Sequence, residues 1–155
     1  MNIDAPQSES FILFELAGTA YGVKSTQVQQ LEMVDNITRV PNADKNVEGV
    51  VFSRGQVIPA INLRTRFGFE KIPFDLRSRL VVVKVRERTI GLIVDSAREF
   101  KNIPEESIGP PPDGLATTNG HYLSGIATVE GNAILLLDLE ELISPSVPQA
   151  SGEQG

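Results

Sequence analysis

The stretch Gly49–Leu63, GVVFSRGQVIPAINL, holds two apolar segments joined by the short polar sequence Ser53-Arg54-Gly55. Valine and isoleucine favour β-strands, and a glycine between two such segments supplies the positive φ that a tight turn requires. The stretch therefore predicts a β-hairpin with Gly55 in its turn and Arg54 at its tip. Judged by this stretch alone, Arg54 is most simply a solubilising turn residue.

The hairpin belongs to an internal repeat. It lies over GIATVEGNAILLLDL, at Gly125–Leu139, in an ungapped alignment that places Gly55 on Gly131. Nearer the N-terminus, FELAGTAYGV at Phe14–Val23 lies over VKVRERTIGL at Val83–Leu92, and this second alignment places Gly22 on Gly91. Two alignments whose segments follow in the same order predict two related halves.

Apolar segments bounded by Gly, Pro, Asn and Asp recur about every eight to twelve residues, which is the rhythm of small antiparallel sheets. The predicted strands are Phe11–Leu16, Ala20–Lys24, Val47–Phe52, Gln56–Asn62, Arg79–Val85, Thr89–Asp95, Leu123–Val129 and Asn132–Asp138. Long helices are not expected. Five short strands per half bury little alone, so we expect an all-β fold of two small five-stranded barrels packed side by side.

Apolar residues at three-residue spacing also recur in both halves. When the alignment of Gly22 with Gly91 is continued, Val28, Leu31 and Val34 fall on Ala97, Phe100 and Ile103. This spacing fits either a bulged strand or a helical turn, and the sequence leaves both open.

The two ends of the chain differ in composition from the rest. Residues 1–10 and 144–155 are rich in polar residues, proline and glycine and offer little to bury, so we expect flexible tails. The folded part is then residues 11–143, which we expect to form one domain.

Composition narrows the class of protein. The chain of 155 residues is 41% apolar and 22% charged, as in soluble globular proteins. Its net charge of −6 disfavours binding to a phosphate backbone. The apolar run Ala133–Leu137 is far shorter than a membrane span, and the start MNIDAPQSES lacks the features of a secretory signal. With no cysteine, disulfides and thiolate metal sites are excluded, and we expect a cytoplasmic protein.

Residues for catalysis are scarce. His121 is the single histidine, and no GxSxG, P-loop or GxGxxG motif occurs. The neighbouring pairs Glu105-Glu106 and Glu140-Glu141 point to different faces and are best interpreted as solvated charge. Asp95 and Asp138 end apolar strands, where they are expected to terminate the ladder or cap a turn. The sequence therefore predicts no enzyme, no metal site and no cofactor.

The order of segments resembles a known family. FILFELAGTAYGVKSTQVQQL, VEGVVFSRGQVIPAINLRTRFG, LVVVKVRERTIGLIVDSAREF and YLSGIATVEGNAILLLDLEELI are together similar to the CheW chemotaxis coupling proteins over about residues 11–143.

In that family the second hairpin usually reads G-x-x-N-x-R-G-x-x-x-P-x-x-D-L, and this chain keeps Gly49, Arg54, Gly55, Pro59 and Leu63. Phe52 stands for the motif's asparagine and Asn62 for its aspartate, while Gln30 replaces the glutamate of the V-x-E-I stretch.

The resemblance implies one CheW-like domain over residues 11–143, built of two intertwined SH3-like five-stranded barrels without catalytic activity. Members of the family bridge the cytoplasmic tips of chemoreceptors, the methyl-accepting chemotaxis proteins, to the regulatory domain of a CheA-type histidine kinase. They work in the cytoplasm at membrane-bound receptor arrays, without inserting into the membrane themselves. The residues that the resemblance places on receptor- or kinase-binding surfaces are Val28, Gln30, Gly49, Ser53, Arg54 and Gly55.

Other functions remain open at this point. The groove between the barrels could be a small-ligand or enzymatic site that depends on His121, or the barrels could form a protein-interaction module outside chemotaxis. Binding of single-stranded nucleic acid is a further alternative, but it needs a basic groove with stacking aromatics. This acidic chain has seven Phe, two Tyr and no Trp.

Overall fold

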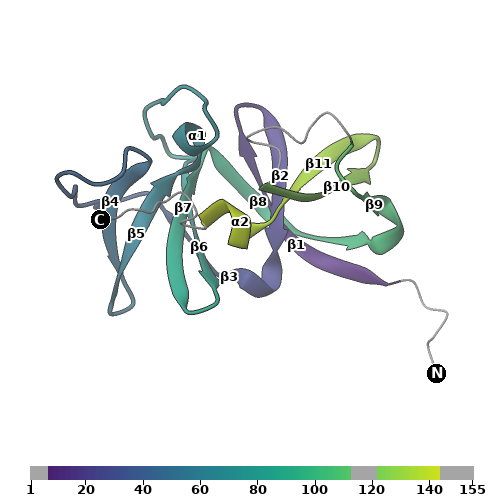
Figure 1. Ribbon diagram of the computed structural model, residues 1–155, viewed down its shortest axis with the longest axis horizontal. Coiled ribbons are helices and arrows are strands. Elements are labelled where there is room, and N and C mark those ends of the chain that lie inside the picture. Colours follow the sequence, from purple (N-terminus) through teal and green to yellow (C-terminus); the bar gives the residue numbers. More distant parts are fainter. Residues whose placement is uncertain (1–6, 113–121, 144–155) are drawn as a thin grey trace, which may run out of the picture.

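The computed structural model describes residues 7–112 and 122–143, and β-strands make up most of this part of the chain (Figure 1). The strands are β1 (Ser8–Leu16), β2 (Thr19–Lys24), β3 (Val28–Met33), β4 (Val47–Ser53), β5 (Gln56–Asn62), β6 (Arg79–Val85), β7 (Arg88–Val94), β8 (Ser96–Pro104), β9 (Ile108–Gly109), β10 (Leu123–Val129) and β11 (Asn132–Leu137). The helices are short: α1 (Leu63–Arg66), α2 (Leu139–Ile143) and the 3-10 turns η1 (Ser25–Gln27) and η2 (Glu105–Ser107). The all-β class is confirmed, whereas His121 and most of both expected tails lie outside the described residues.

The strands form two sheets that lie side by side along the long axis of the molecule (Figure 1). One sheet has six strands in the order β8-β1-β2-β11-β10-β9, and the other has five in the order β3-β6-β7-β5-β4. In the six-stranded sheet the edge strands β8 and β9 are joined by the three-residue turn η2, so the sheet must curl until its edges meet. We call the two units the six-stranded and the five-stranded barrel.

The internal repeat is confirmed pair by pair. Gly22 pairs with Leu13, and their repeat equivalents Gly91 and Val82 pair with each other in the same way. The two parallel pairings, Leu136 with Gly22 and Ala60 with Gly91, are also equivalent. The strands of the first half, β1 to α1, are therefore paired in the same way as the equivalent strands of the second half, β6 to α2.

One expectation about the halves is corrected. A half does not build its own barrel from five strands, because β1 and β2 join β8 to β11 while β6 and β7 join β3 to β5. Each half thus lends its first hairpin to the other barrel. A repeat in sequence shows which strands are equivalent, but it cannot show which copy each strand pairs with.

Three apolar clusters follow from this exchange. The interior of the six-stranded barrel holds Phe11 and Leu13, and that of the five-stranded barrel holds Leu80 and Val82. The third cluster lies between the barrels and takes the alternate residues of the same two strands, among them Phe14 and Val81. β1 and β6 are therefore buried on both faces, which explains their nearly continuous apolar sequences.

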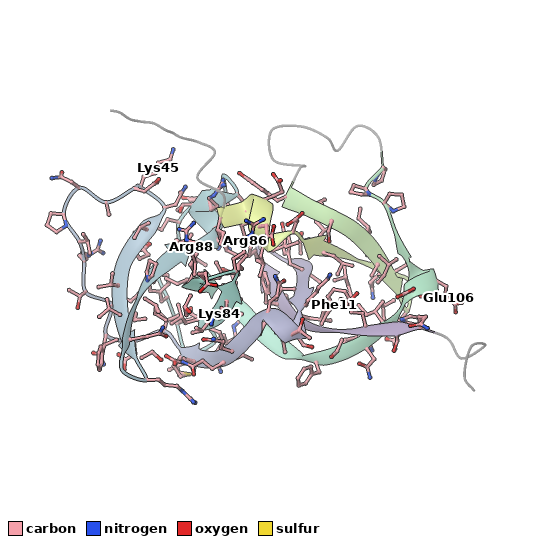
Figure 2. All side chains as sticks on the ribbon, turned by 60° about the horizontal axis from the view of Figure 1, so that its bottom comes forward. Phe11, Lys45, Lys84, Arg86, Arg88 and Glu106 are labelled. Atoms are coloured by element: carbon pink, nitrogen blue, oxygen red, sulfur yellow. The ribbon has the colours of Figure 1, made fainter. Side chains whose placement is uncertain are left out.

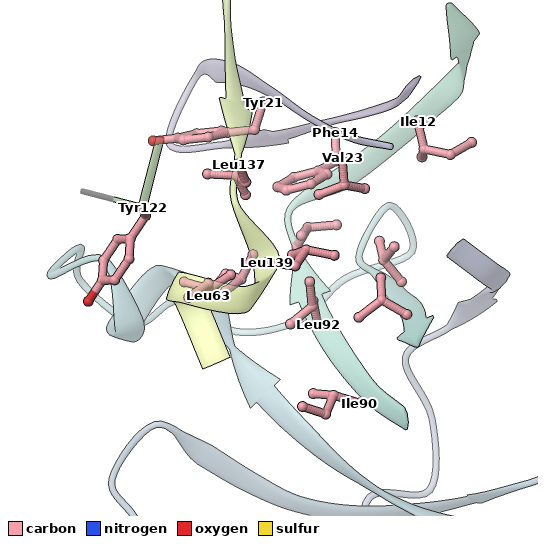
Figure 3. Close-up of a cluster of buried hydrophobic side chains, with 14 of the residues drawn as sticks. Ile12, Phe14, Tyr21, Val23, Leu63, Ile90, Leu92, Tyr122, Leu137 and Leu139 are labelled. Atoms are coloured by element: carbon pink, nitrogen blue, oxygen red, sulfur yellow. The ribbon is translucent and has the colours of Figure 1, made fainter. Parts of the chain in front are cut away.

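The cluster between the barrels draws on both of them (Figure 3). The six-stranded barrel contributes Phe14 and Val23, the five-stranded barrel contributes Leu92, and α1 contributes Leu63, all with no exposed side-chain surface. Full burial of one such side chain stabilises a fold by about 1.5–3 kcal/mol. The two barrels therefore form one folding unit.

Ion pairs reinforce this junction. Arg64 of α1 donates from Nε and Nη2 to the Asp95 carboxylate at 2.8 and 2.9 Å, and the Ala17 amide of the β1–β2 turn donates to the same group at 2.9 Å. At the equivalent place in the other half, Arg86 of the β6–β7 turn contacts Glu140 of α2 at 3.1 Å; Figure 2 shows Arg86 beside α2. Each short helix is thus tied to the hairpin turn that the other barrel presents.

The structural roles expected for Asp95 and Asp138 are confirmed. Burial alone would raise the pKa of Asp95, but the hydrogen bonds from Arg64 and Ala17 and the arginine charges hold it below its ordinary value. The Asp138 carboxylate accepts from the Glu141 amide at 3.2 Å and so caps the first turn of α2.

Candidate functional site

The hairpin of β4 and β5 presents its turn to solvent. Arg54 and Gly55 have φ of 51° and 81°, the pair of positive values found in tight two-residue hairpin turns. The turn expected at Gly55 is confirmed. Arg54 is exposed and makes no hydrogen bond or ion pair within residues 7–112 and 122–143. Its five donors are free for a partner.

The segment that the sequence left open is a bulged strand. β3 pairs with β6, and the register shifts between Val28 and Gln30. After the bulge, Gln30 stands opposite Val82, so its side chain lies on the interior side of the five-stranded barrel. Val28 is partly buried against the cluster between the barrels.

A polar cluster closes the five-stranded barrel. β3 and β4 are the two edges of its sheet, yet the Gln30 amide donates to the Ser53 hydroxyl at 2.6 Å, and that hydroxyl donates to the Glu32 carboxylate at 2.6 Å. Gln30 also donates to Glu32. We call these three side chains the seam. They fix the hairpin of β4 and β5 against β3, next to the Arg54 tip.

Gly49 has a separate role. Its φ is 153°, and a Cβ atom there would lie 2.1 Å from the Thr38 carbonyl oxygen. The bridge between Thr38 and Val50, with two N–H···O bonds of 2.8 Å, holds this loop against β4. The structure therefore brings Gln30, Ser53, Arg54 and Gly55 together, and it places Gly49 and Val28 in the supporting framework.

Several exposed apolar side chains near the seam escaped the sequence analysis. On β3, Leu31 and Met33 are 41% and 50% exposed, and on the hairpin Phe52 and Val57 are 75% and 63% exposed. Each of these residues is next to an inward-facing residue in its strand. Because successive side chains of a strand point to opposite faces, the sequence could have indicated that these four face outward. Glu32 was also missed, because its role depends on closure of the barrel.

A related apolar residue lies on the other barrel. Phe100 of β8 is 62% exposed and stands opposite Ile12, a member of the cluster between the barrels. Its repeat equivalent Leu31 stands opposite Val81 of the same cluster. Both barrels thus present one exposed apolar side chain from a strand that borders the core between them.

A pocket of about 280 Å³ lies between the β1–β2 turn and the segment before β6. The Arg64 and Asp95 groups that line it are engaged with each other, and hydrogen bonding to Asp95 raises the pKa of Arg64 above its ordinary value. In this pocket the charged pair joins the two barrels.

Within the described ranges, no group of three or more His, Asp or Glu side chains is placed to hold a metal ion. The helices described there are also too short to cross a bilayer.

These features define the class of protein: a twin-barrel scaffold whose distinctive groups lie on its outer surface. A family model described as the CheW-like domain matches residues 10–146. The chain belongs to this family.

Related proteins agree with that assignment. The chain is 29% identical to the chemotaxis protein CheW of Klebsiella aerogenes over 136 residues, covering 88% of this chain and 82% of that one. It is 26% identical to the protein of the same name from Bacillus subtilis, with 97% of both chains covered.

A solved structure supports the fold as well. The scaffolding protein TtCheW of Thermoanaerobacter tengcongensis superposes with a TM-score of 0.80 at 32% identity, covering 89% of this chain and 94% of that one. The SH3-like twin-barrel architecture is therefore confirmed.

Proposed function

We propose that this protein is a non-enzymatic adaptor that couples the cytoplasmic signalling tip of a chemoreceptor to the regulatory domain of a CheA-type histidine kinase. It would act in the cytoplasm, at membrane-bound receptor arrays. The observation that carries the proposal is the rigid hairpin tip, where the unpaired Arg54 stands beside the seam. The names of the relatives, which include chemotaxis proteins and a scaffolding protein, support it.

Coupling of this kind needs geometry rather than chemistry. The apolar cluster between the barrels and the Arg64–Asp95 ion pair at their junction hold the two barrels together as one body. A rigid body that holds two partners transmits a displacement of one to the other. Interfaces of about 800 Å² per partner are standard, and weaker contacts suffice where many copies act together.

Arg54→Glu should weaken binding to at least one partner about tenfold, because a guanidinium that pairs with a carboxylate would become a repelling charge. Binding is measured by pull-down and titration calorimetry with a receptor tip fragment and the kinase regulatory domain, separately and together. The thermal midpoint should stay within about 2 °C, because Arg54 makes no hydrogen bond or ion pair in the described part of the fold.

Arg86→Glu is the matched control. Arg86 is also the first residue of a hairpin turn, and its φ of 57° is close to the 51° of Arg54. The two variants therefore make the same change of charge at a similar backbone conformation. Arg86→Glu should leave binding unchanged, apart from the small effect of losing the exposed contact with Glu140. If the unaltered protein bound neither partner, the proposed function would be wrong, whereas unaltered binding by Arg54→Glu would remove only the role of Arg54.

A further inference from the structure

The hairpin of β4 and β5 can be compared with a second, equivalent hairpin in the same chain. The hairpin of β10 and β11 is its repeat equivalent, with a two-residue turn at φ of 51° and 83° against 51° and 81°. Both hairpins also carry a register shift at the same place, before Gly49 and before Gly125. Differences between their side chains therefore do not come from different backbones.

The outward-facing pair next to each turn is where they differ. Phe52 and Val57 stand opposite each other on one hairpin, and Thr128 and Ala133 occupy the equivalent pair on the other. All four are exposed. Because the fold accepts a small or polar residue at both positions, packing does not require the phenylalanine and the valine.

The pair points away from its own barrel. The neighbouring residues Val51 and Ile58 are 6% and 2% exposed and belong to the barrel interior, so Phe52 and Val57 lie on the opposite face. An exposed cross-strand pair of apolar side chains of this size is unusual on a protein that works alone. Phenylalanine and arginine are both enriched in protein–protein interfaces.

The charge beside the pair selects the kind of partner. Arg54 is unpaired in the described structure, whereas its equivalent Glu130 is acidic and approaches Lys101 at 3.9 Å. A symmetric contact between two copies of this hairpin would bring two Arg54 guanidinium groups together. Charge complementarity therefore favours a different protein that offers a carboxylate.

We propose that Phe52 and Val57 form an apolar anchor, with Arg54 at its edge, for a partner surface that presents an apolar depression bordered by a carboxylate. The inference rests on the proposed adaptor function and narrows it. The hairpin of β4 and β5 is the docking element, and the equivalent hairpin of β10 and β11 is not.

The test replaces the outward-facing pair of the β4–β5 hairpin by the equivalent pair of the β10–β11 hairpin. Phe52→Thr with Val57→Ala copies Thr128 and Ala133 onto the docking hairpin without a change of charge. Affinities for the receptor tip fragment and for the kinase regulatory domain are measured by calorimetry. We expect at least a tenfold loss for one of them and an unchanged thermal midpoint. Thr128→Asn is the control and should leave both affinities within about twofold.

The carboxylate at the edge is tested by salt. Binding by the unaltered protein should weaken as sodium chloride rises from about 50 to 500 mM, and Arg54→Ala should lose much of that dependence. If binding by Arg54→Ala depended on salt as strongly as binding by the unaltered protein, the proposed pairing of Arg54 with a carboxylate of the partner would be wrong.

The outcomes separate the two proposals. If the unaltered protein binds a partner and the double variant binds it equally well, the anchor is wrong while the adaptor function stands. If neither partner binds the unaltered protein, the adaptor function fails and the anchor, which rests on it, falls with it. If sedimentation shows self-association that the double variant abolishes, the occupant is a second copy and the proposed partner class is overturned.

Discussion

Asn62 shows how a single side chain can serve two neighbours. Its Oδ1 accepts from the amides of Arg64 and Thr65 at 3.0 and 3.4 Å and so caps α1, while its Nδ2 donates to the Glu48 carboxylate at 2.8 Å. Glu48 is 8% exposed. Burial would raise the pKa of Glu48, but the hydrogen bonds from Asn62 and Lys71 and the charges of Lys71 and Arg39 bring it below its ordinary value.

Asn62→Asp, which restores the aspartate of the hairpin motif, should therefore destabilise this chain. Two carboxylates would meet where one donor and one carboxylate meet now, at a cost of about 2 kcal/mol in the free energy of unfolding at pH 7. The helix cap itself is kept, because aspartate caps as well as asparagine does.

The contribution of Glu48 to stability should change with pH in opposite directions in the two proteins. In the unaltered protein the depressed pKa of Glu48 adds stability above the ordinary carboxyl pKa, and that stability is lost as the pH falls through the folded value. In Asn62→Asp the like charges raise the pKa of one carboxyl, so the penalty is present above that raised value and is relieved below it. The difference in free energy of unfolding between the two proteins, measured with urea, should be smaller at pH 4 than at pH 7. An equal difference at both pH values would contradict this explanation.

Among individual site residues, the sequence predicted those that a local turn determines. Gly55 and the exposed Arg54 follow from the hairpin pattern alone. Glu32 and the inward position of Gln30 could not be predicted, because they depend on two strands that are not neighbours in the sheet meeting at the seam.

At the scale of elements, the seam explains how two edge strands become one barrel wall. Gln30→Glu should weaken it, because a second carboxylate would stand beside Glu32 and the amide donor to Ser53 would be lost. We expect a loss of about 1–2 kcal/mol in the free energy of unfolding. Gln29→Glu is the control, since this neighbour is exposed and the charge change is the same. Equal unfolding curves for the two variants would show that the seam contributes nothing.

The strands that the sequence predicted well are those whose apolar character is strong. β5, β6 and β10 have the predicted bounds, and β1, β2, β4, β7 and β11 differ by one to three residues. β1 starts at Ser8, so Ser8–Ser10 is strand rather than tail.

The strands that the sequence left open or missed lie at edges. β3, β8 and β9 are edge strands of their sheets, where polar residues are tolerated. The bulge in β3 also shifts the alternation by one residue, which produced the ambiguous three-residue spacing.

At the scale of the whole molecule, the exchange of hairpins makes each half depend on the other. The first half contains β3, β4 and β5 but not β6 and β7, which separate β3 from β5 in the sheet. Fragments 1–74 and 75–155, divided in the connection before β6, should each lack a cooperative thermal transition. Mixed together, they should regain the far-ultraviolet circular dichroism of the intact chain. A half that folds alone would contradict the shared core.

The proposed adaptor function requires this twin barrel to hold two different proteins at once. The most direct measurement is size-exclusion chromatography with light scattering on the intact chain, a receptor tip fragment and the kinase regulatory domain, mixed in pairs and all together. We predict a complex that contains all three and is heavier than either pair formed with this chain. If the two partners displaced each other, so that only binary complexes formed at any ratio, the protein would not be a coupling adaptor.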